Sequence, residues 1–431
     1  MGLILRNGTL VDPALGMLEK GDVLVSGARI ESVGGQVPEG GHEGVDCSGC
    51  LVLPGNVCAH THLYSALARG MPAPPRAPST FPEILELIWW RLDRALDAAS
   101  IRYSALIGLL DAARAGTTSL VDHHASPNFI DGSLDIIADA FEEVGLRGVL
   151  CYEVTDRGGR ERSRAGLREN VRFMNENQRD GVRGMMGAHA SFTLEDDTLV
   201  ELAGAAREQG TGVHIHVAED RCDQNDSLRR SGQRVVGRLE GAGVLTPRSI
   251  AAHGVHLDRG ELDSLQRVGA WLVHNCRSNL NNSVGRAPVQ RFGGRAALGT
   301  DGIDGDMFAE SKTAFFRARE DDLATSADRF VELLQAGAAL VSESFDAPLG
   351  RLQPGSAADL IVLEYESPTP LTAGNFPWHW MFALGTDRVR DVMVGGRWIV
   401  RNRELPGLDE ERIRRRAREE AHALWGRMEG L

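Results

Sequence analysis

Short hydrophobic runs alternate with amphipathic stretches through the middle of the chain, and this alternation predicts strands followed by helices. Apolar residues at helical spacing fill the intervening stretches, such as 89–96 and 198–203. The apolar runs that we interpret as strands lie near 51–60, 116–122, 147–154, 183–189, 211–217, 249–253, 270–274 and 296–300. Strands and helices that alternate eight times over this length are typical of a (β/α)8 barrel of the α/β class.

The two ends of the chain have a different pattern, with short strands between glycine-containing turns. Strands are predicted at 3–8, 22–25 and 29–33, and again at 358–363 and 389–400, where a Gly-Gly turn divides the last one. We expect both ends to form one small β-sandwich beside the barrel. The expected units are 1–54 (first part of the sandwich), 55–350 (barrel), 351–405 (second part of the sandwich) and 406–431 (a charged amphipathic C-terminal helix).

Polar residues recur where the hydrophobic runs of the barrel end. His60 and His62 close the first run, and they face the same side of a strand because side chains alternate. Later runs end at His216, His253, His274 and Asp301. Active sites of such barrels are built at the C-terminal ends of the strands, so this placement indicates a catalytic site.

Composition and charge narrow the function. The net charge of −13 argues against binding of nucleic acid through a basic face. No apolar run is long enough to cross a bilayer, and the N-terminus lacks the pattern of a signal peptide, so we expect a cytoplasmic protein without membrane partners. Six cysteines in 431 residues do not make a disulfide framework.

Four motifs together resemble the amidohydrolase superfamily. They are Pro54-Gly55 followed by His60-Thr61-His62, then His216-Val217-Ala218-Glu219, Ala252-His253-Gly254, and Leu298-Gly299-Thr300-Asp301-Gly302. The resemblance covers the whole chain and is strongest to the branch of cytosine deaminases and triazine hydrolases. Stretches such as Asp122-His123-His124-Ala125-Ser126-Pro127 are similar to the SsnA-type aminohydrolases.

The resemblance implies that His60, His62, His216 and Asp301 bind one divalent metal. Three imidazoles and a carboxylate suit Zn²⁺, with Fe²⁺ or Mn²⁺ as alternatives. Binuclear members of the superfamily often use a bridging carbamylated lysine, but no lysine lies between Lys20 and Lys312. A pair of metals bridged by a carboxylate stays open, because Glu153 follows the third strand.

The resemblance also assigns the catalytic roles. Glu219 is expected to carry a proton to the substrate ring, His253 to polarise the attacking hydroxide, and Asp301 to pass the proton of water to the leaving group. The alternative for Glu219 is a residue that only orients His216. Expected substrate contacts are His189, Arg69, His124, Asn279 and Asp304.

These features favour an aminohydrolase that releases ammonia from an amino-substituted N-heterocycle. Hydrolysis of a cyclic amide or displacement of chloride could use the same site, and a metal-stabilised scaffold without activity is a third interpretation. The expected partner is a small heterocyclic substrate. We also expect a homodimer or a higher homo-oligomer, because self-association is usual in this branch.

Overall fold

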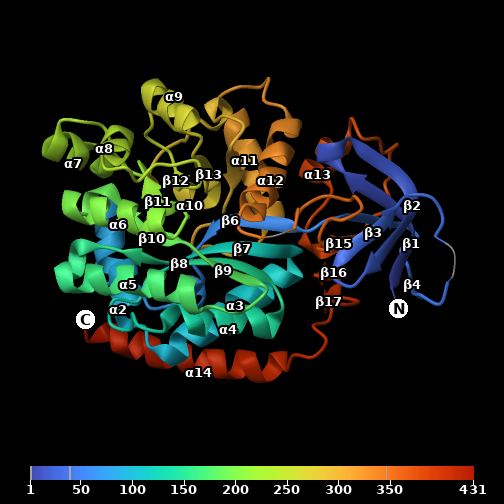
Figure 1. Cartoon of the computed structure of the whole chain (residues 1–431), viewed down its shortest axis with the longest axis horizontal. Coiled ribbons are helices and arrows are strands. Elements are labelled where there is room, and N and C mark those ends of the chain that lie inside the picture. Colours follow the sequence, from blue (N-terminus) through green and yellow to red (C-terminus); the bar gives the residue numbers. More distant parts are fainter. Residues whose placement is uncertain (1, 38–39, 346) are drawn as a thin grey trace.

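A parallel barrel and a smaller sheet lie side by side in the computed structural model, which describes residues 2–37, 40–345 and 347–431 (Figure 1). The barrel strands are β6 (Asn56–Thr61), β7 (Thr117–His124), β8 (Arg147–Val154), β10 (Met186–Ala190), β11 (Val213–Val217), β12 (Ile250–His253), β13 (Trp271–His274) and β14 (Ala296–Leu298), with the short β9 (Val182–Gly184) beside β8. Neighbouring strands pair in chain order, and a parallel bridge from Thr61 to Asp301 joins the last strand to the first. The predicted (β/α)8 barrel is confirmed.

The first predicted strand, near 51–60, is in fact two strands in different sheets. β5 (Cys50–Pro54) pairs with the C-terminal part of the chain, and only β6 enters the barrel. The change of sheet occurs at Gly55, where a side chain is excluded because a Cβ atom would lie 2.2 Å from Cγ2 of Thr118. Hydrophobicity alone could not locate this break, since both strands are buried.

Both ends of the chain build the smaller sheet, as predicted. Its strands are β1 (Leu3–Asp12), β2 (Met17–Ser26), β3 (Arg29–Val33), β4 (Glu43–Asp46), β5, β15 (Leu360–Glu364), β16 (Val389–Val394) and β17 (Arg397–Val400). The antiparallel pairing of β5 with β15 joins the two halves. This sheet has its own hydrophobic core, which includes Leu5, Val52 and Met393.

Helices surround the barrel, as each parallel connection requires. They are α1 (Phe81–Ile84), α2 (Trp90–Ala95), α3 (Ala98–Arg114), α4 (Ser133–Val144), α5 (Arg160–Glu176), α6 (Asp196–Glu208), α7 (Arg221–Ser231), α8 (Val235–Gly241), α9 (Arg259–Val268), α10 (Cys276–Asn281), α11 (Met307–Arg319), α12 (Ala327–Ser342), α13 (Phe376–Phe382) and α14 (Glu410–Glu429). A π-helical turn, Leu85–Trp89, joins α1 to α2.

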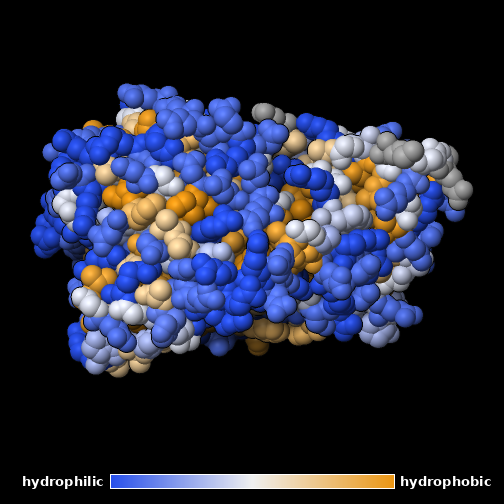
Figure 2. Space-filling model, turned by 90° about the horizontal axis from the view of Figure 1, so that it is seen from below, coloured by the Kyte–Doolittle hydropathy of each residue, from blue (hydrophilic) through white to orange (hydrophobic). Residues whose placement is uncertain are grey.

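The C-terminal helix α14 lies across the bottom of the barrel in Figure 1, where it contacts α2 and α3. Its buried residues are Ile413, Ala417, Leu424 and Met428, spaced at the helical repeat. The face seen from below is mostly hydrophilic (Figure 2), as expected where a charged amphipathic helix covers the barrel. Among the described residues, no helix combines the length and apolar character needed to cross a bilayer.

Candidate metal centre and active site

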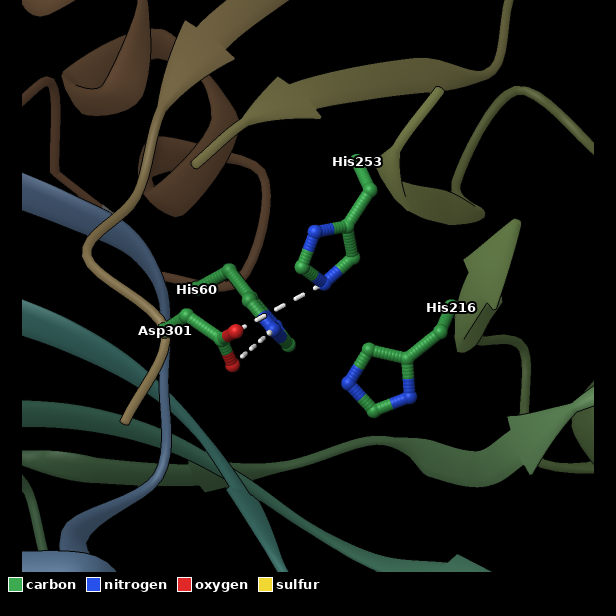
Figure 3. Close-up of side chains that lie close together, drawn as sticks. All are labelled: His60, His216, His253 and Asp301. Atoms are coloured by element: carbon green, nitrogen blue, oxygen red, sulfur yellow. Dashed lines mark ion pairs between the residues drawn. The ribbon is translucent and has the colours of Figure 1, made fainter. Parts of the chain in front are cut away.

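Residues that are far apart in the sequence meet at the C-terminal ends of the barrel strands. His60 lies in β6 with His62 just beyond it, His216 lies in β11, His253 ends β12 and Asp301 follows β14. Figure 3 shows His60, His216, His253 and Asp301 pointing toward one another. Exposure of each residue is below one tenth, so the cluster is buried.

The four residues expected to hold the metal converge through their outer atoms. Oδ1 of Asp301 lies 2.9 Å from Nε2 of His62 and 3.3 Å from Nε2 of His60. Nε2 of His62 is also 3.1 Å from Nε2 of His216. His60 Nε2 is buried and makes no hydrogen bond within the described residues, despite the nearby carboxylate. Four ligand-type atoms this close together, one of them without a hydrogen-bond partner, are typical of ligands that converge on one ion.

The inner nitrogens of the three histidines are anchored elsewhere. His62 Nδ1 lies 2.5 Å from the carbonyl oxygen of His123, His216 Nδ1 lies 2.7 Å from that of His189, and His60 Nδ1 lies 2.8 Å from Nε2 of His214. An Nδ1–H donated to a carbonyl leaves the lone pair on Nε2, which is the arrangement that metal-binding histidines usually have. The residues present therefore fit a divalent metal.

The electrostatics of the cluster also suit a cation. Burial lowers the pKa of His60 to about 3 and that of His216 well below its usual value, so both rings are neutral. Burial also opposes charge on His62, but Asp301 outweighs it and raises the pKa of His62 to about 9. The pKa of Asp301 is held well below its usual range because His60 and His62 outweigh its burial. A metal requires neutral imidazoles and an ionised carboxylate, so His60, His216 and Asp301 already have the ligand form, and His62 releases a proton when a metal binds.

Glu219 lies beside this centre, at the turn that follows β11. Ala218 adopts a φ of 50° there, and its amide donates to Oδ2 of Asp223 at 2.9 Å, which fixes the turn. Burial raises the pKa of Glu219 to about 7, although His253 opposes the shift. A carboxyl group with such a pKa can give and take a proton at neutral pH.

His253 is oriented by Asn279 and faces two carboxylates. Its Nδ1 donates to Oδ1 of Asn279 at 2.8 Å, which leaves the lone pair on Nε2. Nε2 lies 3.6 Å from Oε2 of Glu219 and 3.8 Å from Oδ2 of Asp301. His253 therefore stands between the two groups predicted to move protons.

A pocket of about 780 Å³, counted out to its open mouth, ends at this cluster. Its wall holds the aromatic side chains Tyr64, Phe81, Trp89, Trp90 and Phe192, a lining typical of sites for small apolar or planar ligands. His189 lines the pocket as predicted, with Nδ1 2.7 Å from Oγ1 of Thr193.

Four of the predicted substrate contacts lie outside the pocket lining. Arg69 pairs with Asp111 at the surface, and its side chain is 46% exposed. Asp304 is held by Arg277 at 2.6 Å. Asn279 orients His253 instead of facing the pocket. His124 is buried against Oγ of Ser126 at 2.9 Å.

At the end of β7 the candidate substrate contact, His124, lies on the opposite side of the strand from the metal centre. Only one of two adjacent histidines can face the barrel interior, and His123 is that residue, with His124 on the other side. The ring of His123 packs 4.7 Å from that of His216, centroid to centroid. A run of two histidines gives no signal for which of them faces inward, so sequence alone could not decide.

Several further residues were not predicted. Oγ of Ser278 donates to Oδ2 of Asp301, and Nδ2 of Asn282 donates to Oε1 of Glu219 at 3.4 Å. Asp93 lines the pocket, and Arg157 binds Asp93 at 2.8 Å while its guanidinium lies over the Trp90 ring. Glu153, which the sequence left open as a metal bridge, also lines the pocket. Most of these come from loops and helices beyond the strand ends, where hydrophobic patterning carries little information.

The barrel, the buried ligand set and the proton-transfer groups define a metal-dependent hydrolase. Residues 51–399 match the model of the amidohydrolase family, and the chain belongs to that family. It is a hydrolase that acts on C–N bonds.

Relatives of known name cover nearly the whole chain. A 5-methylthioadenosine/S-adenosylhomocysteine deaminase of Haloarcula marismortui is 32% identical, with 98% of each chain covered. A 5'-deoxyadenosine deaminase of Methanosarcina mazei is 29% identical, with 99% of each covered. The fold is similar to that of a zinc-bound adenosine deaminase of Xanthomonas campestris (TM-score 0.85, 22% identity, 100% and 99% covered).

Proposed function

We propose that this chain is a zinc-dependent aminohydrolase that releases ammonia from an amino-substituted N-heterocycle, with adenosine-type nucleosides as the first substrates to test. The observation that carries the proposal is the protonatable Glu219 carboxyl, buried beside His253 at the end of an aromatic pocket. The names of the full-length relatives support the choice of an aminopurine over a chlorinated or cyclic-amide substrate.

His60, His62, His216 and Asp301 would hold the metal. When bound, a divalent ion supplies Lewis acidity and makes hydroxide available near neutral pH. The remaining chemistry belongs to side chains. His253 orients the attacking water through its free Nε2, and Asp301 accepts one of the water protons at Oδ2, the oxygen that faces His253.

Glu219 completes the proton balance. Its carboxyl protonates the ring nitrogen next to the attacked carbon, which makes that carbon more electrophilic. As the C–N bond to the amino group breaks, the proton on Asp301 passes to the leaving group, which departs as ammonia. Glu219 then recovers a proton from the new hydroxyl group, which becomes a carbonyl.

The test is ammonia release by zinc-loaded protein from amino-substituted purines, adenosine-type nucleosides, pyrimidines, pterins and triazines. We expect ammonia with the wild-type protein and none above background with Glu219→Gln. Glu208→Gln, which changes an exposed glutamate at the end of α6, is the matched control and should behave as wild type. A ring-opened acid or chloride as the product, without ammonia, would replace this proposal by one of the other hydrolytic reactions.

A further inference from the structure

The short helix α10 lies beside the groups that are predicted to move protons. Oγ of Ser278 donates to Oδ2 of Asp301, and Oδ1 of Asn279 accepts from Nδ1 of His253 at 2.8 Å. Asn282 caps the helix and is buried, and it lies one helical turn after Ser278, on the same face. This face of α10 therefore presents a row of polar side chains to the centre, and the contact made by Asn282 has no role yet.

The neighbours of Asn282 fix the orientation of its carboxamide group. Ser278 gives its hydroxyl hydrogen to Asp301, so Oγ of Ser278 accepts from Nδ2 of Asn282 at 3.3 Å. The same Nδ2 donates to Oε1 of Glu219 at 3.4 Å, and Oδ1 of Asn282 accepts from Asn281 at 3.1 Å. If the amide were reversed, its oxygen would face lone pairs of Ser278 and Glu219, so Nδ2 is the atom that faces Glu219.

Asn282 makes the two oxygens of the Glu219 carboxyl group different from each other. Oε1 accepts from Asn282, and within the described residues this is the one hydrogen bond that reaches the carboxyl group. Oε2 lies 3.6 Å from Nε2 of His253, which is too far for a hydrogen bond. A protonated carboxyl group carries its hydrogen on one oxygen and accepts with the other, so the hydrogen belongs on Oε2. Glu219 lines the pocket, where a substrate ring would lie.

The other groups that act on Glu219 do so through their charge. Burial raises the pKa of Glu219 to about 7, the charges of His253 and His62 oppose this shift, and that of Asp301 adds to it. Asn282 is the neighbour that makes a directed bond to one oxygen. A directed bond restricts the rotation of the carboxyl group, which is otherwise broad for the last torsion of a glutamate.

From this geometry we propose that Asn282 is a positioning residue, which holds Glu219 by Oε1 so that the hydrogen on Oε2 faces the substrate ring. The catalytic consequence rests on the proposed function, whereas the contact itself does not. Without the Nδ2 donor the carboxyl group turns more freely, and its hydrogen points away from the ring nitrogen for part of the time. Proton transfer then becomes slower, but substrate binding is unaffected, because the lost interaction matters only in the transition state.

The first test is steady-state ammonia release by Asn282→Leu, which keeps the branched shape of asparagine and has no donor. We expect kcat to fall by about tenfold to a hundredfold, as for a misplaced catalytic group, and KM to stay unchanged. Asn175→Leu, the same change at an exposed position of α5, is the matched control and should behave as wild type. A raised KM with an unchanged kcat would make Asn282 a substrate contact and overturn the proposal.

The second test uses no substrate, so it separates failure of this inference from failure of the proposed function. The C=O stretching band of protonated Glu219 is recorded by infrared spectroscopy of zinc-loaded protein and is identified by its absence in Glu219→Gln. A hydrogen bond to the carbonyl oxygen weakens the C=O bond, so the band should move to higher frequency in Asn282→Leu. It should not move in Asn175→Leu.

An unshifted band in Asn282→Leu would overturn the proposal, and so would a shifted band with an unchanged kcat. Circular dichroism establishes that each variant folds, and Asn282→Val, which also lacks a donor, takes the place of Asn282→Leu if that variant does not fold. If wild type releases no ammonia from any substrate, the proposed function fails, and the band alone decides whether Asn282 holds Glu219.

Discussion

A buried carboxylate in the small sheet and one at the mouth of the barrel differ in how many hydrogen-bond donors surround them. Asp391 in β16 is fully buried and accepts from the amide of Asn402 at 2.7 Å, Nε of Arg390 at 2.8 Å and Nη1 of Arg401 at 2.9 Å. Glu219 at the barrel mouth has a single long hydrogen bond among the described residues, from Asn282.

The difference separates structural acids from functional ones. A buried carboxylate with a full set of donors supports the fold, and removing it leaves those donors unpaired. A buried carboxylate without donors costs stability, and it persists where a ligand or a proton-transfer step uses it. Residue type alone does not distinguish structural carboxylates from functional ones, because both are Asp or Glu side chains that lie near Arg, Asn or His.

Metal removal should give the largest contrast between the two regions. Chelation should abolish hydrolysis, because the buried histidines lose the ion on which they converge, and added Zn²⁺ should restore it. Hydrogen exchange should rise at the ends of the barrel strands and stay unchanged in β15 and β16. Equal loss of protection in both regions would show that the metal holds the whole fold together.

Glu219→Gln should lower kcat by about 10²–10⁴-fold, the range for loss of a general acid–base group. The free energy of unfolding should not fall, since the glutamine removes a buried ionisable group. Steady-state kinetics and urea unfolding check the two parts. A large loss of stability with unchanged kcat per folded molecule would assign Glu219 a structural role.

Asp391→Asn should lower stability and leave catalysis unchanged. Losing the charge beside two arginines should cost about 3 kcal/mol of unfolding free energy, the lower end for breaking a buried ion pair. Urea unfolding measures this cost. The folded fraction should keep the wild-type kcat and KM, so an altered KM would indicate that the small sheet shapes the pocket.

The pH dependence of stability should sharpen the comparison in metal-free protein. The pKa of Glu219 is raised to about 7, above its unfolded value near 4.5, so between these values the native state binds more protons than the unfolded state. Its contribution to the unfolding free energy should therefore fall as pH rises from about 4.5 to 7. Glu219→Gln should flatten this part of the profile by roughly 1–3 kcal/mol, whereas Asp391→Asn should not.

Arg69→Gln should have the smallest effect. The Arg69 side chain lies at the surface, paired with Asp111, and does not line the pocket. We expect unchanged kcat/KM and less than about 1 kcal/mol lost in stability. A fall in kcat/KM of tenfold or more would return Arg69 to the substrate site, as sequence reasoning first placed it.

Much of the fold is visible in the sequence. Apart from the start of β6, the barrel strands lie close to the predicted runs, and the C-terminal helix, expected within 406–431, spans Glu410–Glu429. Hydrophobic periodicity is a local property, so it survives without knowledge of the fold. The predicted units divide the chain between 54 and 55, but the run 51–60 was interpreted as one strand, because two buried strands in different sheets have the same composition.

Some residues of the metal centre could be predicted from the sequence, and others could not. His60, His62, His216, His253 and Asp301 were predicted because each stands at the end of a hydrophobic run, where parallel strands of a barrel meet. Glu219 was predicted from its position in the motif His216-Val217-Ala218-Glu219. Asp304, a predicted substrate contact, pairs with Arg277 in α10 outside the pocket lining, and nothing in the sequence indicates that pairing.

By itself, the sequence determined the order of strands and helices, the family and the chemical types gathered at one end of the barrel. Tertiary structure decided which of His123 and His124 faces inward, which acids find donors, and that Glu153 lies between two imidazoles. Periodicity and motif spacing depend on neighbours along the chain. Hydrogen bonding and burial depend on neighbours in space, and those determine whether a buried carboxylate supports the fold or carries out chemistry.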